Sequence, residues 1–286
     1  MSLPLKTIND AKRFLISEFR AAGIDSADID ARMIVMASTE LSHADVIARG
    51  AETLPPNIIT DIKALAKRRI EGEPIDHIMG YREFYGRNFK VTKDVLSPRP
   101  ETEMLVDEAL AFIKDKPKTR ILDLGTGSGA IIISLLAEDL SAIGTATDMS
   151  EAALKVARDN ANTHTVAGRI VFIQGRWFEP LRQQFDLIVS NPPYINDRDM
   201  EALPPEVKTF DPDLALRGGG DGLDAYRSII SRAKEYLALP GKIIFEIGYD
   251  QGGAVSKLLS EFGFVNVEIH QDLAGHDRVV TATNSR

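Results

Sequence analysis

Residues 123–129 read Asp123-Leu124-Gly125-Thr126-Gly127-Ser128-Gly129, and this stretch decides the fold. A short apolar strand is predicted before it, over residues 121–124, and a helix after it, over residues 130–137. Glycines let a backbone approach a ligand closely, and the first N–H groups of a helix have no partner inside the helix. A strand, a glycine turn and a helix in this order are typical of a loop that binds a nucleotide-like cofactor. The alternative interpretation is an ordinary tight turn.

The spacing of the glycines distinguishes between two cofactors. A dinucleotide loop has the pattern G-x-G-x-x-G, with the helix end facing a pyrophosphate. Here the glycines stand at every second position, and Asp123 precedes them. A carboxylate there repels a pyrophosphate but attracts a cationic amino group. S-adenosylmethionine carries such a group and no phosphate, so we predict it as the cofactor. Its predicted contacts in the loop are Gly125, Thr126, Gly127, Ser128 and Gly129.

An acidic residue follows the next predicted strand, which covers residues 143–147. This residue is Asp148, about 20 positions after the loop, where a carboxylate can accept hydrogen bonds from ribose hydroxyls. We therefore predict that Asp148 binds the cofactor.

A second motif, Asn191-Pro192-Pro193-Tyr194, directly follows a strand predicted over residues 185–190. In an open parallel sheet, the carboxyl end of such a strand faces the ligand crevice. Pro192 has an acceptor carbonyl and no N–H, and Asn191 offers a side-chain carbonyl oxygen. We predict Asn191, Pro192 and Tyr194 as catalytic residues, all four residues as substrate contacts, and Asn191 as a cofactor contact as well. The alternative is a proline-rich turn that merely ends a strand.

Such a stiff pair of acceptors suits a planar NH2 group. An amide or aromatic amine nitrogen is a weak nucleophile, because its lone pair is delocalised. Two acceptors can hold both N–H bonds and favour the charge that grows on nitrogen during attack, which lowers a barrier by a few kcal/mol, roughly. Tyr194 is expected to pack against the flat group. No strong base is required, since the product loses its proton to water.

Strands and helices alternate on both sides of these motifs. The alternation indicates an α/β domain with a mostly parallel sheet and helices on both of its faces. The further predicted strands cover residues 170–173, 242–247, 265–270 and 278–282, and the further helices residues 104–113, 151–160 and 225–237.

The first part of the chain has a different pattern. Apolar stripes at helical spacing predict a small helical bundle, and the aromatic residues between 81 and 95 predict a short hairpin. The sequence Ser97-Pro98-Arg99-Pro100 reads as a stiff junction. We therefore expect a helical domain over residues 1–83, a hairpin linker over 84–100 and the α/β domain over 101–286.

The composition excludes several classes of function. The 286-residue chain has no cysteine, which excludes disulfides and thiolate chemistry, and its five histidines show no metal spacing, so no metal is expected. A net charge of −8 argues against a protein that grips nucleic acid. No signal peptide and no membrane span are predicted, so the expected location is the cytoplasm.

The whole pattern resembles the peptide chain release factor N5-glutamine methyltransferases, a family of class I S-adenosylmethionine-dependent methyltransferases. The tetrapeptide alone is shared with enzymes that methylate the amino group of adenine. The resemblance covers nearly the full length and is carried, besides the glycine loop, by residues 72–86, 96–103, 177–180, 190–195, 219–223 and 272–278.

The resemblance implies a Rossmann-like, seven-stranded methyltransferase domain and a role for each motif. The glycine loop would line the methionine part of the cofactor, Asp148 would hold the ribose, and Trp177 would lie beside the adenine. Residues 191–194 would bind a glutamine in the Gly-Gly-Gln loop of class-1 release factors, while the helical domain grips a separate part of the factor. A monomer is expected. Arg176 departs from the family, which usually has an acidic residue there.

Three other interpretations remain open. An adenine amino-group methyltransferase acting on DNA or RNA uses the same chemistry but needs a basic groove for a flipped base. A binding module that lost catalysis is disfavoured by the intact motif at residues 191–194. A nicotinamide oxidoreductase is disfavoured by the glycine spacing.

Overall fold

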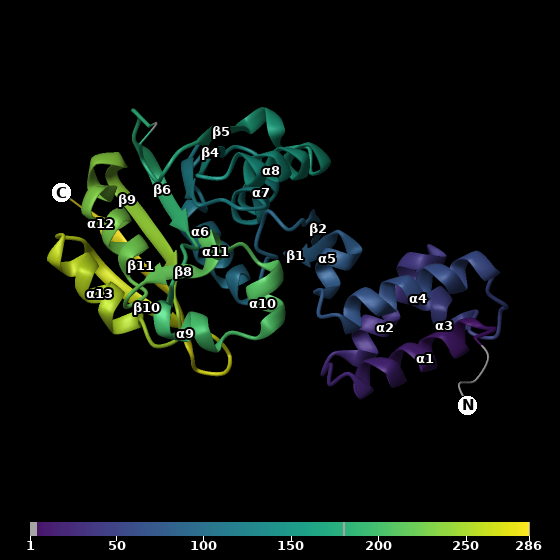
Figure 1. Cartoon of the computed structure of the whole chain (residues 1–286). Helices are drawn as coiled ribbons and strands as arrows, with labels where there is room; N and C mark the ends of the chain where they lie inside the picture. Colours follow the sequence, from purple (N-terminus) through teal and green to yellow (C-terminus); the bar gives the residue numbers. More distant parts are fainter. Residues whose placement is uncertain (1–4, 180, 286) are drawn as a thin grey trace. The chain divides into compact units, whose positions relative to one another are not determined.

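The computed structural model describes residues 5–179 and 181–285, which form two compact units (Figure 1). The first unit ends at Gly80 and the second begins at Tyr81. Within the described residues, no helix is both long enough and apolar enough to cross a membrane.

The first unit is helical, as the sequence predicts. Each helix begins where a polar or proline residue precedes it; at α1, for example, the Thr7 hydroxyl and the Asp10 carboxylate cap each other's backbone N–H groups. The apolar stripes meet in one core that includes Leu15, Phe19 and Ile34. The helices are α1 (Ile8–Ala21), α2 (Ala27–Thr39), α3 (His43–Ala48), α4 (Pro56–Ile70) and α5 (Ile75–Met79).

A hairpin opens the second unit. Its strands are β1 (Tyr81–Phe84) and β2 (Arg87–Lys90), joined by Tyr85 and Gly86. Both turn residues have positive φ, +50° and +68°, which matches the two-residue turns that suit the twist of a hairpin. Phe84 and Phe89 are buried in the core of the second unit, so the hairpin is packed onto the sheet domain.

A seven-stranded sheet forms the centre of the second unit, in the order β10-β11-β9-β6-β3-β4-β5. Neighbouring strands from β9 to β5 are parallel. At the other edge, β11 pairs in antiparallel fashion with both β9 and β10. The predicted α/β fold with a mostly parallel sheet is therefore confirmed. The strands are β3 (Arg120–Leu124), β4 (Ile143–Asp148), β5 (Ile170–Gln174), β6 (Phe185–Ser190), β9 (Leu237–Glu246), β10 (Val265–Gln271) and β11 (Asp277–Asn284).

Helices cover both faces of this sheet, and each face has its own core. Along one strand, successive side chains point to opposite faces, so Leu187 and Val189 enter one core while Ile188 enters the other. The first core is covered by α6 (Glu103–Ile113), α7 (Ala130–Glu138) and α8 (Glu151–Thr163). The second is covered by α12 (Asp224–Tyr236) and α13 (Gly252–Glu261).

The segment between β6 and α12 consists of short elements that the sequence pattern did not predict. Two of its strands pair in parallel as a small separate sheet. The elements are β7 (Ile195–Asn196), α9 (Asp197–Ala202), α10 (Pro205–Phe210), α11 (Asp213–Leu216) and β8 (Arg217–Gly219).

The strand order creates a crevice beside β3. From β3 the chain proceeds outward to β4 and β5, and then returns to β6 on the other side of β3. Parallel sheets bind ligands at the carboxyl ends of the strands at such a reversal. Both sequence motifs follow strands at this reversal.

Candidate active site

A cavity of about 670 Å³ lies within the second unit. Its lining includes the residues that follow β3, β4, β5 and β6, together with the segment after the hairpin and part of the β6–α12 segment. It therefore occupies the crevice that the strand order creates. The predicted site residues that line it are Gly125, Thr126, Gly127, Ser128, Asp148, Trp177, Asn191 and Pro193; Gly129, Pro192 and Tyr194 are not part of the lining.

The glycine loop leaves open space above its backbone. Gly125, Gly127 and Gly129 have φ of +72°, +54° and +81°, which residues with a Cβ rarely adopt. A Cβ at Gly127 would meet nothing within 4 Å. A Cβ at Gly129 would instead lie 2.8 Å from Cδ1 of Ile133, so this glycine is needed for packing between the loop and α7.

Two aspartates near the loop differ in whether they line the cavity. The side chain of Asp123 is fully buried, accepts a 2.6 Å hydrogen bond from Thr126 Oγ1, and is not part of the cavity lining. Burial raises its pKa to about 7. Asp123 therefore supports the loop through Thr126, and its direct contact with an amino group stays a prediction.

Asp148 lines the cavity at the end of β4. Its oxygens accept backbone hydrogen bonds from Gly127 and Ser150, both at 2.9 Å. Desolvation raises its pKa above the usual value, in opposition to these bonds. A carboxylate oxygen has more than one lone pair, so Asp148 can accept further hydrogen bonds from a bound hydroxyl.

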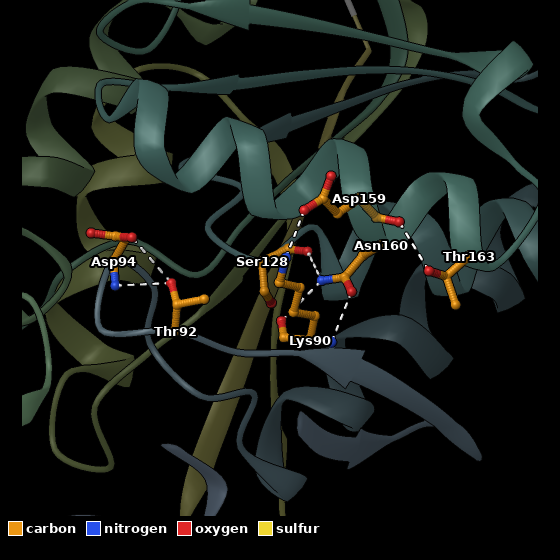
Figure 2. A network of polar contacts seen from close by, with 7 residues as sticks. All are labelled: Lys90, Thr92, Asp94, Ser128, Asp159, Asn160 and Thr163. Carbon is orange, nitrogen blue, oxygen red and sulfur yellow. Dashed lines mark hydrogen bonds and ion pairs between the residues drawn. The ribbon is translucent and has the colours of Figure 1, made fainter. Parts of the chain in front are cut away.

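Asn160 of α8 connects the glycine loop to Lys90, the last residue of the hairpin (Figure 2). Its Nδ2 donates to the carbonyl oxygens of Ser128 (2.9 Å) and Lys90 (3.1 Å), and its Oδ1 accepts from the Lys90 N–H (2.8 Å). The Lys90 ammonium adds an ion pair with Asp159 at 2.8 Å. Residues 93–99, which follow this anchor, line the cavity. The sequence analysis did not identify Asn160. The signal that could have identified it is its position as a polar residue within the apolar stripe of a predicted helix.

Trp177 lies directly against the glycine loop. Its Cζ3 atom would be 3.5 Å from a Cβ at Gly125, and its ring packs on the core under α12. Its backbone has a φ of +51°, and its Nε1 is buried with no hydrogen-bond partner among the described residues. Arg176 also lines the cavity. Contact between Trp177 and an adenine ring stays a prediction.

Asn191 follows β6 and lines the cavity. Its Nδ2 donates to Thr102 Oγ1 at 3.3 Å, and the amide lies close enough to the Glu246 carboxyl group to lower the pKa of that group. Within the part of the chain that the structure describes, its Oδ1 accepts no hydrogen bond. The amide is thus held by its donor end, which leaves the acceptor end for a ligand.

Gln251 fixes the backbone at Tyr194, the last residue of this motif. Its Nε2 donates to the carbonyl oxygen of Tyr194 at 3.0 Å and to that of Gly222 at 3.3 Å. Pro192 is buried, and the Tyr194 ring packs against the core under α12. Desolvation raises the pKa of the Tyr194 hydroxyl to about 12. Sequence reasoning missed Gln251, because nothing in the local pattern signals a partner 57 positions away.

The residues around the cavity fit S-adenosylmethionine. The space over Gly127 is open, an acceptor carboxylate stands beside it, and an aromatic ring borders the loop. No group of His, Asp or Glu side chains suited to a metal ion occurs in residues 5–179 and 181–285.

Comparisons with known proteins show which family the chain belongs to. Residues 10–80 match the PrmC N-terminal domain and residues 102–204 the methyltransferase small domain. The release factor glutamine methyltransferase of Cereibacter sphaeroides is 44% identical over 96% of this chain and 97% of its own length. That of Bradyrhizobium diazoefficiens is 42% identical over 97% and 95%.

A solved structure supports the fold independently of close sequence similarity. A methyltransferase from Pyrococcus furiosus has a TM-score of 0.53 at 15% identity, covering 77% of this chain and 98% of that one. The family model of the N-terminal domain, the full-length relatives and the cofactor cavity agree: the chain belongs to the release factor glutamine methyltransferase family of S-adenosylmethionine-dependent enzymes.

Proposed function

We propose that this protein methylates the side-chain amide nitrogen (N5) of the glutamine in the Gly-Gly-Gln loop of class-1 peptide chain release factors. The observation that carries the proposal is the placement of Asn191, which lines the same cavity as the glycine loop and whose amide nitrogen donates to Thr102. The names of the full-length relatives support the substrate class.

Residues of the second unit would hold the cofactor. Gly125–Ser128 would accommodate its methionine part, Asp148 would accept from the ribose hydroxyls, and Trp177 would border the adenine. When bound, S-adenosylmethionine supplies an electrophilic methyl group on a sulfonium.

Residues 191–194 would hold the substrate amide. Oδ1 of Asn191 and the carbonyl oxygen of Pro192 would each accept one N–H of the glutamine side chain. Held in this way, the glutamine nitrogen would take the methyl group that the cofactor supplies, and the electrons of the methyl–sulfur bond would stay with sulfur. The two acceptors stabilise the positive charge on nitrogen, and they orient it in line with the methyl group. The extra proton then leaves to water.

The two units would have separate roles, in substrate recognition and in methyl transfer. We propose residues 1–83 as the domain that grips a separate part of the release factor, 84–100 as the linker and 101–286 as the methyltransferase domain. The match of residues 10–80 to the PrmC N-terminal domain supports this division. Because release factors act in the cytoplasm, the proposal also places the enzyme there, as a monomer.

Incubation with radiolabelled S-adenosylmethionine tests the proposal. The purified protein should label a class-1 release factor and leave a variant without the loop glutamine unlabelled. An intact cofactor affinity together with an unlabelled release factor would contradict it. Labelling of an adenine-containing oligonucleotide instead would favour the nucleic-acid alternative.

A further inference from the structure

Strand β9 ends in a buried carboxyl group next to the substrate motif. Glu246 is the last residue of the strand and only 3% exposed. Its predecessor Phe245 pairs with Ser190 of β6, so Glu246 stands beside Asn191 at the same edge of the sheet. The sequence prediction and the proposed mechanism leave this residue without a role.

Glu246, Thr102 and Asn191 form a group of neighbouring polar side chains. The Thr102 hydroxyl and the Asn191 amide lie close enough to the carboxyl group of Glu246 to lower its pKa, and Oε2 of this carboxyl group is buried with no hydrogen-bond partner among the described residues. Asn191 Nδ2 donates to Thr102 Oγ1 at 3.3 Å. The three residues come from the short helix Pro100–Thr102, the end of β6 and the end of β9. The position of the amide is therefore fixed by three separate elements.

An ionised carboxyl group can only accept hydrogen bonds. It therefore binds the NH2 end of the Asn191 amide and disfavours the flipped orientation, in which two oxygens would face each other. The hydroxyl of Thr102 cannot make this selection alone, because a hydroxyl both donates and accepts.

We propose that Glu246 is a positioning residue for methyl transfer: its carboxylate holds the NH2 end of Asn191 and thereby keeps Oδ1 facing the substrate amide. The inference rests on the proposed function, since it assigns the role of that oxygen. It adds a residue that acts through Asn191, not by contact with the substrate.

The charges around Glu246 determine when it is ionised. Desolvation raises its pKa to about 7; Glu101 acts in the same direction, while the bonds from Thr102 and Asn191 and the charge of Arg278 oppose it. On α12, the Tyr226 hydroxyl donates to the backbone oxygen of Glu246 at 2.9 Å.

Arg278 and the charged groups on α6 also have hydrogen-bond or ion-pair partners of their own. Arg278 Nε bonds to Asp272 at 2.8 Å. On α6, Glu103 accepts from the Tyr85 N–H and Glu108 pairs with His270. Asp107, also on α6, accepts from the Tyr85 hydroxyl.

Protonation changes what Glu246 can do. A neutral carboxyl group can donate to the amide oxygen, so the flipped orientation of Asn191 becomes available below a pH of about 7. Activity should therefore rise with pH through this value in the wild type. The glutamine at position 246 of Glu246→Gln does not titrate, so its activity should lack this rise.

The test compares Glu246→Gln with Glu268→Gln, whose carboxylate on β10 is largely exposed. With an unmethylated class-1 release factor at pH 8, Glu246→Gln should lower kcat at least about tenfold and leave the Kd for S-adenosylmethionine within about twofold. The control should match the wild type. Glu246→Asp, which keeps the charge, should recover part of the loss and the pH dependence.

Thermal stability distinguishes a positioning role of Glu246 from a purely structural role. The pKa of Glu246 in the folded state lies above its ordinary value, which means that folding disfavours the ionised carboxylate. The contribution of Glu246 to stability therefore falls as pH rises toward 7. Glu246→Gln has no carboxylate to ionise and so avoids this loss of stability. Its Tm at pH 8 should be equal to or above that of the wild type. A lower kcat with an unchanged or higher Tm supports positioning; wild-type kcat and an unchanged pH profile would overturn it.

Nuclear magnetic resonance gives a readout that needs no turnover. The side-chain ¹⁵N resonance of Asn191, assigned by its loss in Asn191→Ala, should shift with an inflection near pH 7 in the wild type and not in Glu246→Gln. An Asn191 resonance that does not titrate in the wild type refutes the inference. If wild-type protein fails to methylate the release factor, the proposed function fails, and the NMR titration still decides whether Glu246 holds Asn191.

Discussion

At the residue scale, one amide carries the proposed chemistry. Asn191 Nδ2 donates to Thr102 and lies near Glu246, and Oδ1 is left to accept from the substrate. Spacing along the chain indicated Asn191 as an acceptor, because it follows a strand and precedes two prolines. It could not indicate what holds the amide in place, because Thr102 is 89 positions away.

Substitution of this amide should affect the reaction far more than the binding of the cofactor. We expect Asn191→Ala to lower kcat about 100-fold, because one of two fixed acceptors for the developing charge is lost. The Kd for S-adenosylmethionine, measured by calorimetry, should stay within about threefold. Asn162→Ala, an exposed position on α8, is the matched control. Near-normal turnover in Asn191→Ala would remove this residue from the mechanism.

At the element scale, the apolar pattern was enough for the long elements of the sheet domain. The strands predicted over residues 121–124 and 185–190 are observed as Arg120–Leu124 and Phe185–Ser190. The short helices α3 and α5 and the segment from β7 to β8 have too few residues for a periodicity to emerge. Their positions depend on tertiary contacts, which a local pattern does not contain.

The junction of the hairpin, α8 and the glycine loop should respond to one substitution. Asn160→Leu leaves the Lys90 and Ser128 backbone groups without their side-chain partner, at a cost of about 1–3 kcal/mol in the free energy of unfolding. Because the same bonds hold the loop and residues 93–99, cofactor affinity should fall several-fold. Denaturant unfolding and calorimetry measure the two effects. Asn162→Leu on the same helix should change neither, and equal behaviour of both variants would argue against the proposed anchor.

At the scale of the whole molecule, buried carboxyl groups should determine how stability depends on pH. Desolvation raises the pKa of Asp123 and Glu246 to about 7 and that of Asp148 above its ordinary value. The folded state therefore binds these protons more tightly than the unfolded state, and stability should fall as pH rises from about 5 to 8. Asp221 and Asp272, whose pKa values are lowered to about 2 by arginine hydrogen bonds, favour folding throughout that range.

Thermal unfolding between pH 5 and pH 8 measures this dependence. The wild-type Tm should decline across the range, and Asp123→Asn should decline less, because one of the titrating groups is gone. A wild-type Tm that rises steadily toward pH 8 would be inconsistent with buried carboxyl groups of raised pKa.

The central claim is that the acceptors at residues 191 and 192 present a glutamine amide to the bound cofactor. Mass spectrometry of the release-factor loop peptide, after reaction of the unmethylated factor with this protein and S-adenosylmethionine, tests it most directly. We expect one added methyl group, located by fragmentation on the side-chain nitrogen of the Gly-Gly-Gln glutamine and absent with Asn191→Ala. An unmodified glutamine, or a methyl group on another residue, would contradict the account.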